Sequence, residues 1–128
     1  MAFTTTIQMN WATVNRSIAH SKDYTSGSLV SVDESIADSE TDKQVDAAFD
    51  LTQVQSLYMS SDQDILVEGN DGAGIAGSVA LKANIPYIWT QDTYDTVKFT
   101  ADITALFITN ASGSPAQFKL EVLVDPTV

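Results

Sequence analysis

The chain has 128 residues, of which 44% are hydrophobic, and its 17 acidic and 6 basic residues give a net charge of −11. This length and hydrophobic content predict a single folded domain over residues 1–128. The charge disfavours binding to nucleic acid or to anionic membranes, because both present negative phosphates. The absence of cysteine excludes disulfides, thiolate metal ligands and thiol catalysis.

The N-terminal residues alternate between apolar and polar side chains. Phe3, Ile7, Met9 and Trp11 fall on one side of an extended chain, which predicts a strand that starts almost at the first residue. Such a strand either joins the sheet of its own domain or, as an arm over residues 1–11, adds to the sheet edge of a neighbouring subunit. The first ten residues lack the basic start and apolar stretch of a secretory signal, and no apolar run is long enough to span a membrane.

The middle of the chain predicts several short strands separated by polar loops. Residues 11–19 are interpreted as a continuation of the first strand after a bend, residues 21–28 as a loop, and residues 33–43 as an acidic, solvated loop. The segments expected to be extended are residues 29–32, 45–51, 54–60, 65–67, 75–83 and 84–89, with Pro86 placing the last of these at a sheet edge or a strand start.

The last third carries the clearest strand pattern. Phe118, Leu120, Val122 and Val124 alternate with polar residues, which indicates a strand with one buried face. Residues 103–108 are apolar on both sides, as in a central strand or in one buried in a contact between subunits. The link at residues 110–115 contains Asn, Gly and Pro, so the two strands are expected to form an antiparallel hairpin.

Together these segments predict an all-β fold, an antiparallel β-sandwich or jelly-roll-like domain of about eight or nine short strands. No convincing amphipathic helix interrupts the pattern.

The motifs that could carry chemistry have simpler structural explanations. Gly72, Gly74 and Gly77 match G-x-G-x-x-G, but the following residues predict a strand, whereas a dinucleotide site needs a helix there. The cluster Asp62, Asp64, Glu68 and Asp71 lacks the spacing of a compact calcium loop and is interpreted as acidic turns. No metal site and no cofactor are therefore expected.

No enzymatic activity is expected either. His20 is the only histidine, and no nucleophile elbow accompanies it. Asn110 and Ser112 fit the N-glycosylation pattern, although the turn already explains the asparagine. Tyr87 and Trp89 lie on one side of the same predicted strand and could stack on a sugar, but a place in the core is the preferred interpretation.

Three segments resemble small virion proteins of tailed bacteriophages. Residues 81–89 contain A-N-x-P-x-x-W, residues 101–113 run into a strand that ends in T-N-x-[ST]-G, and residues 118–125 form a closing strand that ends in Asp. The likeness covers about the last 45 residues, and its motifs are structural rather than catalytic.

The resemblance implies a structural virion protein, in the first place a capsid decoration or cement protein on the capsid surface. Its implied partners are the major capsid protein or other virion proteins, and its implied state is a homo-oligomer, with a trimer favoured. Phe3, Ile7, Met9 and Trp11 are then the candidate interface residues of the arm. The alternatives are a tail or neck component and a carbohydrate- or receptor-binding module.

Overall fold

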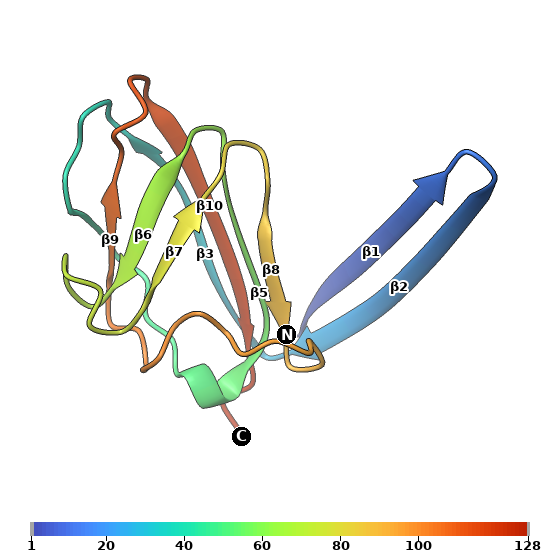
Figure 1. Ribbon diagram of the computed structural model, residues 1–128. Coiled ribbons are helices and arrows are strands. Elements are labelled where there is room, and N and C mark those ends of the chain that lie inside the picture. Colours follow the sequence, from blue (N-terminus) through green and yellow to red (C-terminus); the bar gives the residue numbers. More distant parts are fainter. Residues whose placement is uncertain (1, 128) are drawn as a thin grey trace.

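The computed structural model describes residues 2–127 as an antiparallel β-sandwich from which one long hairpin projects (Figure 1). The predicted all-β class is confirmed, with ten strands in the described part of the chain. They are β1 (Phe3–Thr13), β2 (Arg16–Ser26), β3 (Ser28–Ile36), β4 (Lys43–Val45), β5 (Val54–Ser61), β6 (Ile65–Gly69), β7 (Ser78–Leu81), β8 (Tyr87–Thr90), β9 (Leu106–Thr109) and β10 (Ala116–Val124). A single 3₁₀ turn, η1 (Leu51–Gln53), precedes β5.

The strands form three antiparallel sheets. β1 and β2 pair only with each other, and the sandwich consists of one sheet in the order β3-β10-β5-β8 and a second in the order β4-β9-β6-β7. The central strand β10 alternates between buried and more exposed residues from Ala116 to Val122, with Phe118, Leu120 and Val122 directed inward and fully buried. They meet buried side chains of the opposite sheet, among them Val67 and Ile108, in one continuous core. Burying these apolar faces against each other holds the two sheets together.

The predicted hairpin between residues 103–108 and 117–124 is wrong. β9 and β10 belong to different sheets, so residues 110–115 carry the chain across the sandwich instead of turning it back within one sheet. Asn110 is fully buried at this crossing, and its side-chain amide donates to the carbonyl oxygens of Ile36, Ala37 and Ser114. The buried side chain thus binds backbone carbonyl groups on both sides of the crossing, and it is not available for glycosylation in the folded chain.

Three further expectations need correction. Residues 33–36 belong to β3, so the loop expected at residues 33–43 is shorter. Residues 21–28 are not a loop, because residues 16–26 form β2, and the bend expected within residues 11–19 is a complete chain reversal at Val14 and Asn15. The strand expected at residues 45–51 ends at Val45, although Ala47 and Phe49 remain buried and Phe49 forms an isolated bridge with Ile103. The alternation of apolar and polar residues in this segment predicted burial correctly, but it did not predict that the ladder of hydrogen bonds ends at Val45.

Candidate interaction surface

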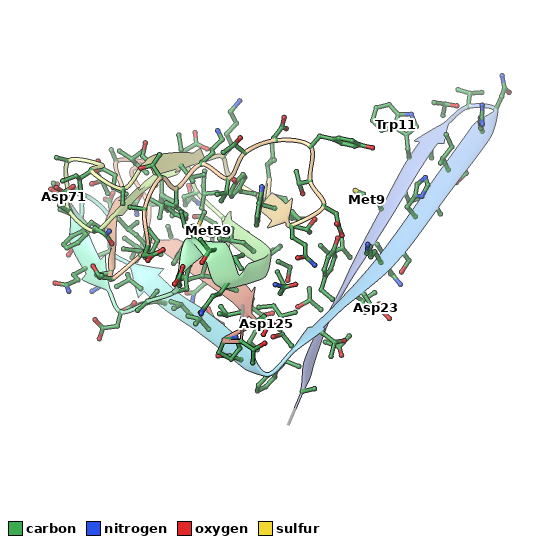
Figure 2. All side chains as sticks on the ribbon, turned by 90° about the horizontal axis from the view of Figure 1, so that it is seen from below. Met9, Trp11, Asp23, Met59, Asp71 and Asp125 are labelled. Carbon is green, nitrogen blue, oxygen red and sulfur yellow. The ribbon has the colours of Figure 1, made fainter. Side chains whose placement is uncertain are left out.

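The hairpin formed by β1 and β2 has one polar and one largely apolar face. Opposite residues of an antiparallel pair share a face, and the register pairs Met9 with His20 and Trp11 with Ile18. The apolar face of the hairpin carries Phe3, Ile7, Met9, Trp11, Ile18 and Tyr24, together with the polar residues Thr5, Thr13, Arg16, His20, Lys22 and Ser26. Met9 and Trp11 lie on the side toward the sandwich, and Asp23 lies on the opposite side (Figure 2).

The polar face is held by hydrogen bonds between the two strands. The hydroxyls of Thr4 and Thr25 lie 2.9 Å apart, and Thr6 Oγ1 donates to Asp23 Oδ1 over 2.7 Å. Nearer the tip, Ser17 Oγ donates to Asn10 Oδ1. A two-stranded sheet alone is marginally stable in water, and these cross-strand pairs stabilise this one without covering its apolar face.

The base of the hairpin is fastened to the sandwich through Tyr24. This side chain is 7% exposed, and its hydroxyl lies 3.1 Å from Thr90 Oγ1 and 3.0 Å from Asp92 Oδ2. Lys22 Nζ lies 2.8 Å from the same Asp92 oxygen and 5.5 Å from the centre of the Tyr24 ring. Hydrogen bonds from Lys22 and then Tyr24 lower the pKa of Asp92, and the hydrogen bond to Asp92 raises the pKa of Lys22.

The base also covers part of the outer face of the first sheet. Leu123 points outward from β10, yet it is fully buried, and both β1 and β2 contact β10. Ser26 Oγ donates to the carbonyl oxygen of Val124 over 2.6 Å. Only Gly27 separates β2 from β3, so the hairpin continues directly into an edge strand of the sandwich (Figure 1).

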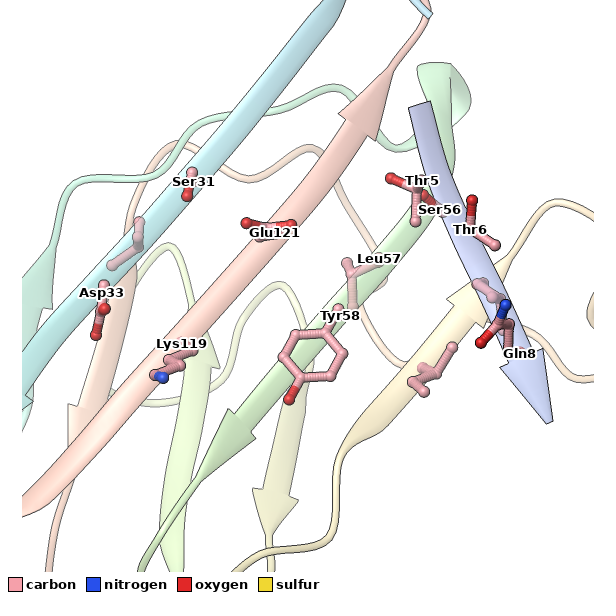
Figure 3. A pocket seen from close by; sticks show the side chains of 13 residues that line it. Thr5, Thr6, Gln8, Ser31, Asp33, Ser56, Leu57, Tyr58, Lys119 and Glu121 are labelled. Carbon is pink, nitrogen blue, oxygen red and sulfur yellow. The ribbon is translucent and has the colours of Figure 1, made fainter. Parts of the chain in front are cut away.

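Beyond its base the hairpin diverges from the sandwich and leaves two clefts of about 530 Å³ each. In the sheet cleft, Thr5 and Gln8 of β1 lie across from Tyr58, Lys119 and Glu121 on the outer face of the sheet (Figure 3). The loop cleft lies between the hairpin and residues 88–94. It is lined by Ile7, Met9, His20, Ser21, Lys22, Tyr24, Ile88, Thr90, Asp92, Thr93 and Tyr94. Ile7 and Ile88 line both clefts, which therefore adjoin.

The apolar face of the hairpin becomes more exposed toward the tip. Ile7 is half-buried, whereas Met9 is 64% and Trp11 72% exposed. Tyr94 is fully exposed on the loop across the cleft. Exposed apolar side chains gathered on adjoining surfaces are typical of an interaction site.

The four predicted interface residues lie together on this face, in β1. The prediction missed Ile18 and Arg16 on β2, and Ile88 and Tyr94 on the sandwich side. The signal for β2 was present in the sequence, since Arg16, Ile18, His20, Lys22 and Tyr24 are large and alternate with Ser17, Ala19, Ser21 and Asp23.

The other sequence motifs form no comparable site. The glycine-rich segment at residues 72–77 connects β6 to β7, and no helix follows it. Its Asp71 accepts from the amides of Ile75 and Ala73, which lowers the pKa of Asp71. Within residues 2–127, no three His, Cys, Asp or Glu side chains are placed to hold a metal ion.

The two aromatic residues of β8 pack against the core. Trp89 Nε1 donates to the carbonyl oxygen of Asp95, and the Tyr87 hydroxyl accepts from the amide of Lys98. Both side chains therefore have structural partners.

Comparison with protein-family models, with curated proteins and with solved structures found no match. No helix among the described residues has the length and hydropathy that crossing a bilayer requires.

Proposed function

We propose that this chain is a structural virion protein, a capsid decoration protein that binds the shell of a tailed bacteriophage and stabilises it. Two observations support the proposal. Residues 81–125 resemble small virion proteins of such phages, and the sandwich carries a projecting arm that can fasten it to neighbouring subunits of a particle. The role requires no catalysis and no cofactor.

The hairpin is the observation that carries the proposal. Its polar face is internally hydrogen-bonded, while Met9, Trp11 and Ile18 present an apolar surface that the sandwich does not cover. Large aromatic side chains of this kind are frequent anchors at protein interfaces. The high negative charge of the sandwich keeps the unassembled protein soluble until the hairpin binds the capsid shell.

The proposal is tested on virions of the phage whose genome encodes the chain. Gold-labelled antibodies raised against the purified protein should decorate the head, and disrupting the gene should lower the temperature at which heads release DNA. Label confined to the neck or tail would support the tail-component alternative instead. Virions that carry no label would overturn the proposal.

Variants then test the arm. Reconstitution of gene-disrupted particles with Trp11→Ser protein should restore neither labelling nor stability, whereas Ile75→Ser protein should restore both. Trp11 and Ile75 are 72% and 73% exposed, so neither change opens a cavity in the sandwich. Equal binding of the two variants would show that the arm is not the attachment.

A carbohydrate-binding role would need exposed rings at Tyr87, Trp89 or Tyr94. Tyr87 and Trp89 pack on the core, and of the three only Tyr94 is fully exposed, so this role has less support. Specific hits on a glycan array would nevertheless contradict the structural proposal.

A further inference from the structure

The hairpin and the clefts beside it complement each other in shape and chemistry. The tip, defined here as Trp11, Val14, Arg16 and Ile18, offers exposed apolar side chains and one cation. The loop cleft offers Ile7, Met9, Ile88 and Tyr94. Its volume of about 530 Å³ lies within the range of sites that enclose a ligand, about 300–1,000 Å³.

The tip does not fill the cleft of its own chain, since Trp11 is 72% and Ile18 37% exposed and neither residue lines the cleft. Tyr24, Lys22 and Ser26 fix the base of the hairpin to the sandwich. Each strand has 11 residues in total, base included, or roughly 36 Å at about 3.3 Å per residue. The reversal at Val14 and Asn15 is consequently the part of the hairpin farthest from the sandwich (Figure 1).

The distribution of charge favours a second copy as the partner. Residues 3–26 contain Arg16, Lys22 and Asp23, a net charge of +1. The rest of the chain has 4 basic and 16 acidic residues, a net charge of −12, and the two parts sum to the −11 of the whole. Two whole chains repel each other, but the hairpin of one is attracted to the sandwich of another.

Individual side chains fit the same arrangement. Among the described residues the only ion pair joins Lys22 to Asp92, so Arg16 at the tip and Glu121 in the sheet cleft both lack a partner of opposite charge. The sheet cleft, which Asp33 and Lys119 also line, adjoins the loop cleft through Ile7 and Ile88.

We propose that the hairpin tip of one copy seats in the loop cleft of a second copy, with Trp11 and Ile18 buried against Ile88 and Tyr94. Donor and acceptor surfaces differ, so the contact is head-to-tail, and repeating it builds a ring where the rotation closes and an open filament where it does not. The contact involves Trp11 and Ile18, on which the proposed function also rests, but it concerns the purified protein and is tested without a capsid.

The test measures mass in solution by light scattering and sedimentation velocity. The donor variant, Trp11→Ser with Ile18→Ser, loses the tip and keeps the cleft. The acceptor variant, Ile88→Glu with Tyr94→Ser, loses the cleft and keeps the tip. The control is Ile75→Ser, an exposed apolar residue on the loop between β6 and β7.

Native protein and control should form the same oligomer, and each double variant should associate at least about 30-fold more weakly, the effect of losing one interface hot spot. An equimolar mixture of the two double variants should form a heterodimer, because one intact tip meets one intact cleft. Each chain has a mass of 13.8 kDa, so the heterodimer is resolved from both monomers. Its formation also shows that both variants are folded.

A native protein that stays monomeric at hundreds of micromolar would overturn the inference. Double variants that still associate as the native protein does would overturn it as well. An oligomeric native protein whose two variants fail to combine would point to a symmetric contact between two hairpins instead. Virion labelling is read separately, so a monomer that decorates heads refutes this inference alone.

Discussion

Replacing Leu123 by alanine tests whether the base of the hairpin is docked on the sandwich in solution. Leu123 is fully buried although it lies on the outer face of β10, outside the main core. Its neighbours across the sheet are Leu29 on β3 and Ser56 on β5, and the strands that contact β10 over this face are β1 and β2. The burial of Leu123 therefore depends on the hairpin, whereas that of Leu120 depends on the opposite sheet.

The expected cost follows from this burial. Leucine-to-alanine substitutions at fully buried positions destabilise by about 2–5 kcal/mol, and the value depends on how far the cavity collapses. Leu123 lies under a two-stranded element held mainly at its base, which can settle toward the gap, so we expect about 2–3 kcal/mol. Leu120→Ala, in the rigid interior between two sheets, should cost about 3–4 kcal/mol.

Urea denaturation of both variants, followed by circular dichroism, measures these costs. The same two substitutions are then made in a chain that lacks residues 2–26. There Leu123 is exposed, so its replacement should cost less than about 0.5 kcal/mol, while the Leu120 effect should persist. A Leu123→Ala cost below about 0.5 kcal/mol in the full chain would show that the hairpin base is not docked.

Three further predictions concern single residues. Asn110→Ala removes the buried amide that donates to the carbonyl oxygens of Ile36, Ala37 and Ser114 and should cost about 2–4 kcal/mol in the same urea assay; a change below 1 kcal/mol would contradict this. Gly77 and Gly113 both have φ of +91°, but only at Gly77 would a Cβ collide with the carbonyl oxygen of Lys98. Gly113→Ala should therefore lower the free energy of unfolding by about 1–2 kcal/mol, and Gly77→Ala should lower it clearly more. Equal melting temperatures of the two variants would refute this difference. In the folded chain the pKa of Asp92 is lowered from 3.8 and that of Lys22 is raised from 10.5. Both side chains are therefore charged, and their ion pair should be intact, at every pH between these two usual values. Asp92→Asn should accordingly speed hydrogen exchange near Tyr24 at pH 7, and the difference from the native chain should disappear as the pH falls well below 3.8.

The sandwich was predictable because its strands bury one face within the same chain. The alternation of Phe118, Leu120 and Val122 identified β10 and its inward side. Likewise, the segments around residues 54–60 and 65–67 became β5 and β6. In each case a period of two reports burial directly.

Pairing was less predictable than burial. The link at residues 110–115 has the composition of a hairpin turn, yet the buried side chain of Asn110 bonds to the connection after β3 and directs the chain into the other sheet. Turn residues show that a chain changes direction, but they do not determine which strand it pairs with next. That choice depended on contacts more than 70 positions apart in sequence, which local patterns do not contain.

In the hairpin, apolar and polar residues alternate as they do in the sandwich, but most of the apolar residues of the hairpin are not buried within the chain. Phe3, Ile7, Met9 and Trp11 alternate as clearly as the core residues of β10, but exposure increases along the strand instead of remaining low. The sandwich buries only the base, although the pattern continues to Trp11 and is matched on β2 by Ile18. A solvated hairpin gains nothing from an apolar face that nothing covers, and that face promotes aggregation. The alternation beyond Ile7 is therefore best explained by burial in an assembled state, and the proposed seat between Met9, Ile88 and Tyr94 of a second copy supplies that burial.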